Sequence, residues 1–409
     1  MRTRWLIPML AITACASTEA LLQTPPDASV SVPDPSTESD GGFDAAPDGA
    51  EARPCSDCEY FPDVCSSDVL CSNGPFDAKT LGGPLDLNTT INTIRGRSNS
   101  DVWAVGTIGA VAHFDGATWT RSDPGTRDPL TALWLRDGGE LTFGSPVRVY
   151  TRGLGIVDAG AGTSDGGWSL NVPTIPDALI DRYLRAQLGS SWGMPGATWF
   201  WTTSFQGAAT TGLWRVRQLP SNALEVQEGT PGLDCYSVPC AEMRGIHGAS
   251  ANELWAVGGS GSAILITGAE GDTPSLKPFN TQTWHALYGV WVSSTNDAWA
   301  VGAGGTVRHY TGDPILWDVV SDMPTSGNLR AVWGSSSTDI WAVGDAALVL
   351  HYDGHRWSRV KIAGLGLLRP DLTTVWVAAT GHVWIGGEGV ILSLGDTGGA
   401  GRGDKRSRR

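Results

Sequence analysis

The chain has 409 residues, of which 17% are charged, and it contains 54 Gly and 19 Trp at a formal net charge of -14. This length can bury a large core, and so many Gly and Trp residues with so few charges are typical of a β-rich exported protein. Proteins that bind nucleic acid concentrate Lys and Arg on one face. We therefore expect no nucleic-acid partner.

The first residues form a short export signal. Two arginines precede an apolar run over residues 5–12, which is too short to span a bilayer. The residues ITAC at 12–15 resemble the lipobox of bacterial lipoproteins, in which the cysteine carries the lipid. The resemblance implies a signal peptide over 1–14, and lipidation of Cys15. Because Ala16 rather than Asp follows, it also implies anchoring to the outer membrane or cell surface of a Gram-negative bacterium. The alternative is an ordinary signal peptide with a chance cysteine.

Residues 15–54 are rich in Pro, Asp, Ser, Gly and Ala and contain hardly any large apolar residue. Such a segment cannot bury enough surface to offset the entropy lost on ordering. We expect a disordered acidic tether between the lipid and a folded domain.

Six cysteines remain once Cys15 is assigned to the lipid. An even number in an exported chain favours disulfides, two within the segment 55–75 and one in DCYSVPC. A four-thiolate zinc site in the first cluster is the alternative, but the loose spacing of its second half and the oxidising compartment favour disulfides, so we expect no metal. The candidates are Cys55, Cys58, Cys65, Cys71, Cys235 and Cys240.

One motif recurs along the rest of the chain. The stretch SNSDVWAVGTIGAVAHFDGATW at 98–119 returns as SSSTDIWAVGDAALVLHYDGHRW at 335–357. The marker tryptophans of five copies are Trp103, Trp255, Trp299, Trp341 and Trp384, and their last three intervals are 44, 42 and 43 residues. Two degenerate copies with Phe143 and Phe200 at the marker position fill the long gap, which makes seven units.

Each unit contains four short apolar strands separated by turns rich in Gly, Ser and Asp, with no helical period. This pattern predicts an all-β fold, a seven-bladed β-propeller with blades of about 43 residues over 76–395. The seventh unit lacks its fourth strand, so we expect an N-terminal strand from 74–87 to close the last blade. The cysteine-stapled segment 55–75 would lead into that strand, and 396–409 would form a basic disordered tail.

The endings YDGxxW at 352–357 and FDGxxW at 114–119, each preceded by a WAVG strand, resemble bacterial propellers of the Asp-box or photosystem-II-assembly-factor-like kind. The similarity spans about 305 residues, from 91 to 395. In the Asp box a residue separates Asp from Gly, whereas the two are adjacent here. The resemblance implies the propeller fold, and propellers host many unrelated functions.

Two residue types recur at fixed blade positions. His113, His309 and His351 share one place on the third strand. They are spread around the ring and cannot share one metal ion, so we expect packing or hydrogen-bonding roles. Four tryptophans recur near the end of the first strand, where their rings could stack on sugars or form the core between blades. They are Trp134, Trp291, Trp333 and Trp376.

An enzymatic alternative is a sialidase-like glycosidase on the same fold. Such an enzyme needs a cluster of arginines that binds a carboxylate, a carboxylic acid and a Tyr-Glu pair. The arginines are scattered along this sequence, so we expect no catalysis and no cofactor.

Extra residues fall in the second to fourth units, at 155–167 and 229–243. Insertions in repeat folds map to loops and often mark the binding face. A disulfide between Cys235 and Cys240 would preorganise the second loop, which makes Asp234 and Tyr236 candidate ligand-binding residues; a neutral insertion is the alternative. The predicted function is a monomeric cell-envelope lipoprotein whose propeller is a non-catalytic binding or assembly platform for an envelope protein or polysaccharide.

Overall fold

The structure is a computed structural model that describes residues 57–76, 85–155, 162–175, 180, 184, 186–206, 211–229, 235 and 238–394. All of them belong to one compact unit, Pro54–Arg409. The expected signal peptide, Cys15, the tether and the basic tail lie outside the described residues, as do Cys55, Asp234 and Tyr236.

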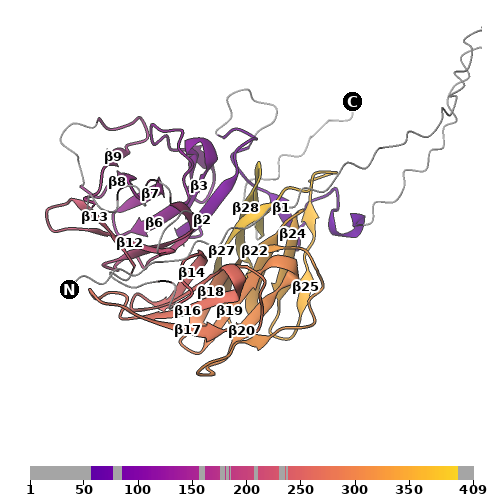
Figure 1. The fold of residues 1–409 in the computed structure, drawn as a ribbon. Helices are drawn as coiled ribbons and strands as arrows, with labels where there is room; N and C mark the ends of the chain where they lie inside the picture. The colour runs from indigo at the N-terminus through magenta and orange to yellow at the C-terminus, as the bar shows by residue number, and fades with distance from the viewer. Residues whose placement is uncertain are drawn as a thin grey trace, which may run out of the picture. The chain divides into compact units, whose positions relative to one another are not determined.

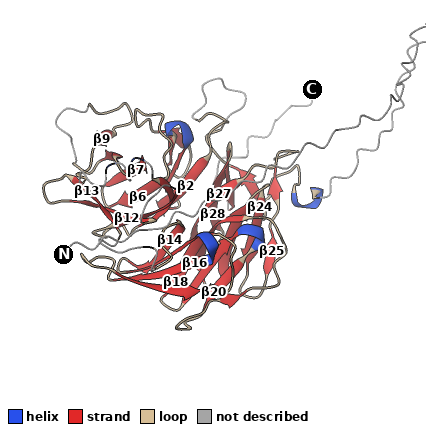
Figure 2. Ribbon diagram, viewed as in Figure 1, coloured by secondary structure: helices blue, strands red, loops and turns tan. Residues whose placement is uncertain are grey.

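The chain folds into seven sheets, antiparallel except where β26 pairs parallel with β1, and short 3-10 turns are the main other elements (Figures 1 and 2). We number the sheets as blades 1 to 7 in chain order from β2. Six blades are continuous meanders of four strands, in the orders β2 to β5, β6 to β9, β10 to β13, β14 to β17, β18 to β21 and β22 to β25. The predicted all-β, seven-bladed propeller is confirmed.

The strand bounds follow the four positions in a blade. The first strands are β2 (Ile91–Ser98), β6 (Ala132–Arg136), β10 (Gln187–Trp192), β14 (Met243–Ser250), β18 (Leu287–Ser294), β22 (Leu329–Ser336) and β27 (Leu372–Ala379). The second strands are β3 (Asp101–Gly106), β7 (Gly139–Ser145), β11 (Phe200–Gln206), β15 (Glu253–Gly258), β19 (Asp297–Gly302), β23 (Asp339–Gly344) and β28 (His382–Gly387). The third strands are β4 (Val111–Phe114), β8 (Arg148–Arg152), β12 (Leu213–Gln218), β16 (Ser262–Thr267), β20 (Val307–Tyr310), β24 (Leu348–Tyr352) and β29 (Val390–Leu394). The outer strands are β5 (Trp119–Arg121), β9 (Ser169–Asn171), β13 (Leu224–Glu228), β17 (Ser275–Asn280), β21 (Asp318–Val319), β25 (Trp357–Arg359) and β1 (Leu70–Ser72), with β26 (Ile362–Ala363) beside β1.

The first strands form the inner wall of a closed ring. Each contacts the first strand of the next blade, and β27 of blade 7 contacts β2 of blade 1. Thr373 Oγ1 donates a hydrogen bond to the Ile91 carbonyl across this last junction. Seven apolar clusters fill the seven spaces between neighbouring blades. The core is therefore distributed between the sheets.

The last blade is closed by β1, which pairs antiparallel with β29. This strand precedes the expected segment 74–87, so the predicted position is wrong. Leu70 is fully buried in the core between blades 6 and 7. Phe76 and Leu85 form only an isolated parallel bridge, and Leu85 packs instead with the core between blades 7 and 1. The strand that covers the open edge of blade 7, with its buried Leu70, therefore lies within the cysteine-rich segment 55–75.

The marker position shifts in the two degenerate blades. In the five regular blades the marker Trp lies opposite the fifth residue of the first strand. In blade 2 Leu141 lies opposite Trp134, and in blade 3 Trp201 lies opposite Trp192. Phe143 and Phe200 are therefore two residues and one residue away from the markers. Phe200 packs toward blade 2, whereas Trp201 packs toward blade 4, because successive strand residues face opposite sides.

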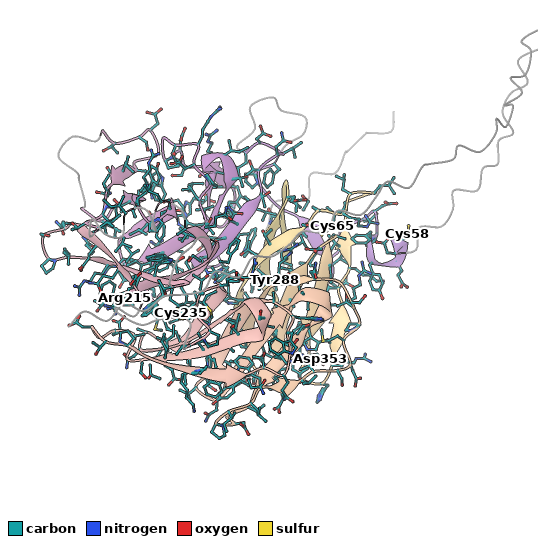
Figure 3. All side chains as sticks on the ribbon, viewed as in Figure 1. Cys58, Cys65, Arg215, Cys235, Tyr288 and Asp353 are labelled. Carbon is teal, nitrogen blue, oxygen red and sulfur yellow. A yellow bond between two sulfur atoms is a disulfide. The ribbon has the colours of Figure 1, made fainter. Side chains whose placement is uncertain are left out.

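The described cysteines form disulfides. Cys65 is bonded to Cys71 and Cys235 to Cys240, while Cys58 is also disulfide-bonded (Figure 3). Cys71 lies in β1 itself, so the disulfide between Cys65 and Cys71 ties the closing strand to the segment before it. Because Cys65 and Cys71 are bonded to each other, they do not provide two thiolates of a zinc site.

Candidate functional site

The first strands bring one repeated stretch to the ring axis. Its copies are INTIR at 91, LTALW at 130, LGSSW at 188, MRGIH at 243, LYGVW at 287, LRAVW at 329 and LTTVW at 372. The leading Leu, Ile or Met is buried in every blade. The second residue differs between blades, and the fifth is Trp except for Arg95 in blade 1 and His247 in blade 4.

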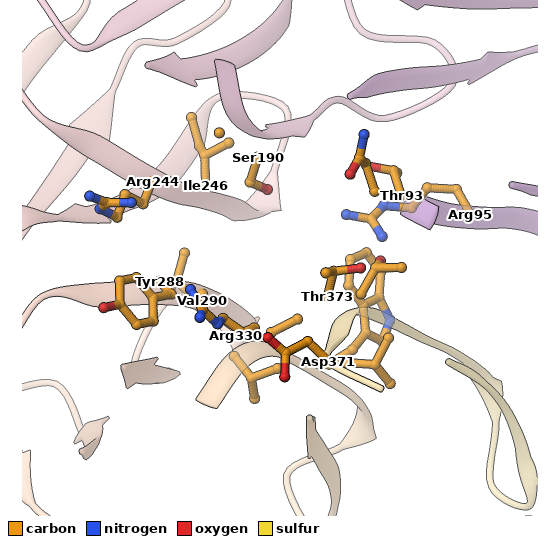
Figure 4. Close-up of a pocket in the computed structure, with 18 of the residues that line it drawn as sticks. Thr93, Arg95, Ser190, Arg244, Ile246, Tyr288, Val290, Arg330, Asp371 and Thr373 are labelled. Atoms are coloured by element: carbon orange, nitrogen blue, oxygen red, sulfur yellow. The ribbon is translucent and has the colours of Figure 1, made fainter. Parts of the chain in front are cut away.

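These stretches line a cavity of about 280 Å³, which we call the axial well. Its lining comes from the first strands of six blades and includes Arg95, Arg244, Tyr288, Arg330 and Trp333 (Figure 4). Asp371, just before β27, and Glu388, just after β28, also line it. The first strands begin at this end of the ring, so the well opens on the face formed by the loops that enter them.

Three side chains form the floor of the well. The Arg95 guanidinium carbon lies 4.3 Å from the centre of the Trp333 ring, a cation–π contact between blades 1 and 6. His247 of blade 4 meets the same ring edge to face, with ring centres 4.8 Å apart. These two contacts join blade 6 to blades 1 and 4, which are not its neighbours in the ring. The three side chains therefore lie across the central axis of the propeller.

His247 is neutral in this setting. Burial and then the positive charge of Arg95 lower the pKa of His247 to about 3. The backbone N–H of Val292 donates to His247 Nδ1 at 3.1 Å. Nδ1 is therefore the acceptor, and the ring proton is on Nε2.

Two arginines of the well have no acidic partner among the described residues. Arg95 Nη1 donates to the Ile94 carbonyl at 2.7 Å, and burial lowers the pKa of its guanidinium to about 10. Arg244 lies between aromatic rings, 4.5 Å from the centre of Phe205 and 5.4 Å from that of Tyr288, and its buried Nε makes no hydrogen bond. Buried cations without a counter-charge are unfavourable.

The third arginine and the carboxylates have partners. Arg330 forms an ion pair with Asp345. Burial would raise the pKa of Asp345, but the hydrogen bonds from Arg330 and Asn328 outweigh it and lower the pKa. At the rim, Asp371 Oδ1 accepts the backbone N–H of Ala346 at 2.9 Å. The well therefore has an excess of positive charge at its floor and wall.

The predicted site tryptophans have different environments. Trp134, Trp291 and Trp376 are buried in the cores between blades. Trp291 packs on Gly334 of the next blade, where an added Cβ would lie 2.8 Å from the ring. Trp333 is half-buried and lines the axial well. Among the four, Trp333 is thus the one placed to contact a ligand there.

The three recurring histidines each bond within their own blade. His113, His309 and His351 contact Asp101, Asp297 and Asp339 at 2.9, 2.7 and 2.8 Å. Each ring also lies against the marker Trp of its blade. The expected packing and hydrogen-bonding role is confirmed.

The expectation that the arginines are scattered is wrong in three dimensions. Arg95, Arg244 and Arg330 are far apart in sequence, but all lie on first strands, which meet at the axis. Sequence reasoning missed the well because it looked for what the repeats share. The available signal was where they differ, since Arg95 and His247 replace Trp at the fifth position.

Within the described ranges, no group of three or more His, Cys, Asp or Glu residues could hold a metal ion. The same residues contain no helix that is long and apolar enough to span a membrane.

No protein-family model matches this chain, and no curated protein matches it. Solved structures do match. YCF48 from Cyanidioschyzon merolae aligns with a TM-score of 0.57 at 13% identity, over 76% of this chain and 97% of that protein. YCF48 bound to D1 peptide aligns with a TM-score of 0.57 at 16% identity, over 85% and 100% of the two chains. The WD40 β-propeller domain of Doa1 aligns with a TM-score of 0.52 at 12% identity, over 78% and 96%.

These similarities show the fold alone. They show a β-propeller fold, in agreement with the seven blades seen here.

Proposed function

We propose that this chain is an exported, lipid-anchored propeller that binds a protein partner on the face where the axial well opens, without catalysis. The observation that carries the proposal is that Arg95 and Arg244 in the well have no acidic partner among the described residues. Such charges do not stabilise a fold by themselves. They lower its stability and are retained where they bind a ligand.

The same face exposes large apolar side chains. Trp284 is 87% exposed and Leu367 is 88% exposed, and both lie in loops that enter first strands. Trp284 is three residues before β18, so it lies within about 11 Å of the inner wall. Leu87 and Leu368 are exposed in equivalent loops. Apolar groups gathered beside a cavity are typical of protein-binding surfaces.

Three further observations support an exported, lipid-anchored binding protein. The disulfides of the described residues are typical of an oxidising compartment. The similar propeller YCF48 has been solved bound to D1 peptide, which supports a protein segment over a glycan as the ligand class. The ITAC stretch supports lipid anchoring of Cys15.

The test places a photo-crosslinking residue at position 284 of the full chain in its native envelope, with position 295 as the matched control. Thr295 is exposed in the turn between β18 and β19, at the end of the first strand that lies away from the Trp284 loop. We expect one protein to cross-link at 284 but not at 295, and Trp284→Asp to weaken its capture at least tenfold. Equal cross-linking at both positions, or attachment only to polysaccharide, would contradict the proposal.

A glycosidase remains the second candidate because three arginines, two carboxylates and Tyr288 do meet at one well. However, Arg330 is paired with Asp345, and Tyr288 makes no hydrogen bond to a carboxylate among the described residues. We expect no hydrolysis of a fluorogenic sialoside. Turnover that disappears in Tyr288→Phe would establish the glycosidase instead.

A further inference from the structure

The axial well contains donors that the protein does not satisfy. A guanidinium has five N–H donors, and the single acceptor for Arg95 among the described residues is the Ile94 carbonyl. Arg95 forms no ion pair among the described residues, and burial lowers the pKa of its guanidinium to about 10. Figure 4 shows the Arg95 guanidinium reaching toward the cavity near Thr373. A ligand that accepts hydrogen bonds and carries negative charge would satisfy these donors.

The surroundings restrict the chemistry of that ligand. Ile246, Val290 and Trp333 give the well apolar walls, which suit an apolar body. Asp371 and Glu388 at the rim would repel an anion of high charge, such as a phosphate or a polyanion. A volume of about 280 Å³ admits a compact group. Arginine binds the planar carboxylate through two parallel hydrogen bonds.

We propose that the axial well is a binding site for a carboxylate with a compact apolar body, which Arg95 binds from the floor. Trp333 orients the Arg95 guanidinium by stacking. The chemistry of the ligand follows from the well itself, and only the source of the carboxylate rests on the proposed function. That source is an acidic or terminal residue of the protein partner, or a free organic acid with the same chemistry.

The test uses the full chain, purified oxidised, and calorimetric titration with matched acid and amide pairs. The pairs are phenylacetate with phenylacetamide, and N-acetylphenylalanine with its amide. We expect each acid that binds to do so at least tenfold more tightly than its amide, because the amide lacks the charge. Binding of phenylacetate identifies a free acid as sufficient, whereas binding of N-acetylphenylalanine alone identifies a peptide end.

Variants assign the site. Arg95→Gln should weaken binding of the acid at least tenfold. The control Arg121→Gln should leave it unchanged, since this half-exposed arginine on β5 lies beside Asp123, outside the well. Equal affinity for acid and amide, undiminished binding by Arg95→Gln, or no binding of either acid would each overturn the proposal.

A second measurement separates binding from a structural role. Arg95→Met removes the unpaired charge but keeps an apolar side chain against Trp333, so we expect Tm without ligand to rise and the stabilisation by acid to disappear. A fall in Tm with stabilisation by acid retained would show that Arg95 is structural. Capture at position 284 that persists in Arg95→Gln would remove the well from partner recognition, and the proposed protein-binding face would then rest on its exposed apolar side chains.

Discussion

At the scale of single residues, the buried polar groups have two contrasting roles. In blades 1, 5 and 6 one carboxylate at the start of the second strand accepts hydrogen bonds from side chains of its own blade. These residues are Asp101, Asp297 and Asp339. Burial would raise the pKa of Asp339, but hydrogen bonds from Ser335, His351 and Trp341 outweigh it and lower the pKa. His247 has no such compensation and remains neutral at the axis. The first arrangement supports the blade, whereas the second leaves a polar group beside the well.

Stability should therefore depend on pH through His247. Its folded pKa of about 3 lies below the unfolded value of about 6.5. The unfolded chain binds the proton first, so the stability contributed by neutral His247 is present above pH 6.5 and is lost as pH falls toward 3. We expect the free energy of unfolding in denaturant to fall by up to about 1.4 kcal/mol per pH unit in this window.

The control for this dependence is His355→Gln, which changes an exposed histidine in a turn. His247→Gln should flatten the slope between pH 6 and pH 4, and His355→Gln should not. Parallel slopes in the wild type and His247→Gln would show that another group carries the proton.

At the scale of elements, the closing strand is held by contacts from both sides. The Arg369 guanidinium pairs with Asp57 at 2.9 Å and lies 3.4 Å from the centre of the Phe61 ring. The Leu70 N–H donates to the Lys361 carbonyl at 3.1 Å. The disulfide between Cys65 and Cys71 then limits the freedom of the three-residue strand β1. The N-terminal segment is therefore part of blade 7.

Removing this disulfide should loosen blade 7 locally. In Cys65→Ser/Cys71→Ser we expect the free energy of opening at the amides of β1 and β29 to fall by about 2 kcal/mol, from the loop-closure entropy restored to the open state. Hydrogen exchange measured by mass spectrometry tests this. The amides of β18 and β19 in blade 5 serve as the internal control. Equal loss in both blades would indicate global destabilisation and contradict a local role.

At the scale of the whole molecule, ring closure places positive charge at the centre of an acidic protein. The chain has a net charge of -14, yet the floor and wall of the axial well contain Arg95 and Arg244. Coulomb interactions between exposed charges are screened over about 8 Å at physiological salt, so the local arginines dominate inside the well. Only the closed ring produces this arrangement.

The proposed lipid anchor at Cys15 can be tested by the location of the protein in the cell. Expressed as the full chain in a Gram-negative host, the wild type should fractionate with membranes, and Cys15→Ser should move to the soluble fraction. Cys235→Ser should remain with the membranes, because it leaves the predicted lipid site intact. Mass spectrometry of the N-terminal peptide should find acyl chains on Cys15. A soluble wild type, or an unmodified Cys15, would contradict lipid anchoring.

The repeated residues predicted the architecture because they encode contacts within a blade. Trp103, Trp299 and Trp341 lie on second strands as expected, and the histidines bond inside their own blades. The degenerate copies were harder to place, because Leu141 replaces Trp and Trp201 is preceded by another aromatic residue. Successive side chains of a strand point to opposite faces of the sheet, so an error of one residue in the marker position assigns the side chain to the wrong face. Local sequence does not specify which neighbouring blade packs on each face.

By itself the sequence determined the number of blades, the order of the strands and the pairing of Cys235 with its near neighbour Cys240, since all of these depend on local repetition and short separations. Only the tertiary structure decided that β1 closes the ring and that Arg95, His247 and Trp333 meet at the axis. The physical reason is that ring closure brings one strand from every blade to a common axis. Residues separated by more than two hundred positions thereby become neighbours, although no local pattern connects them.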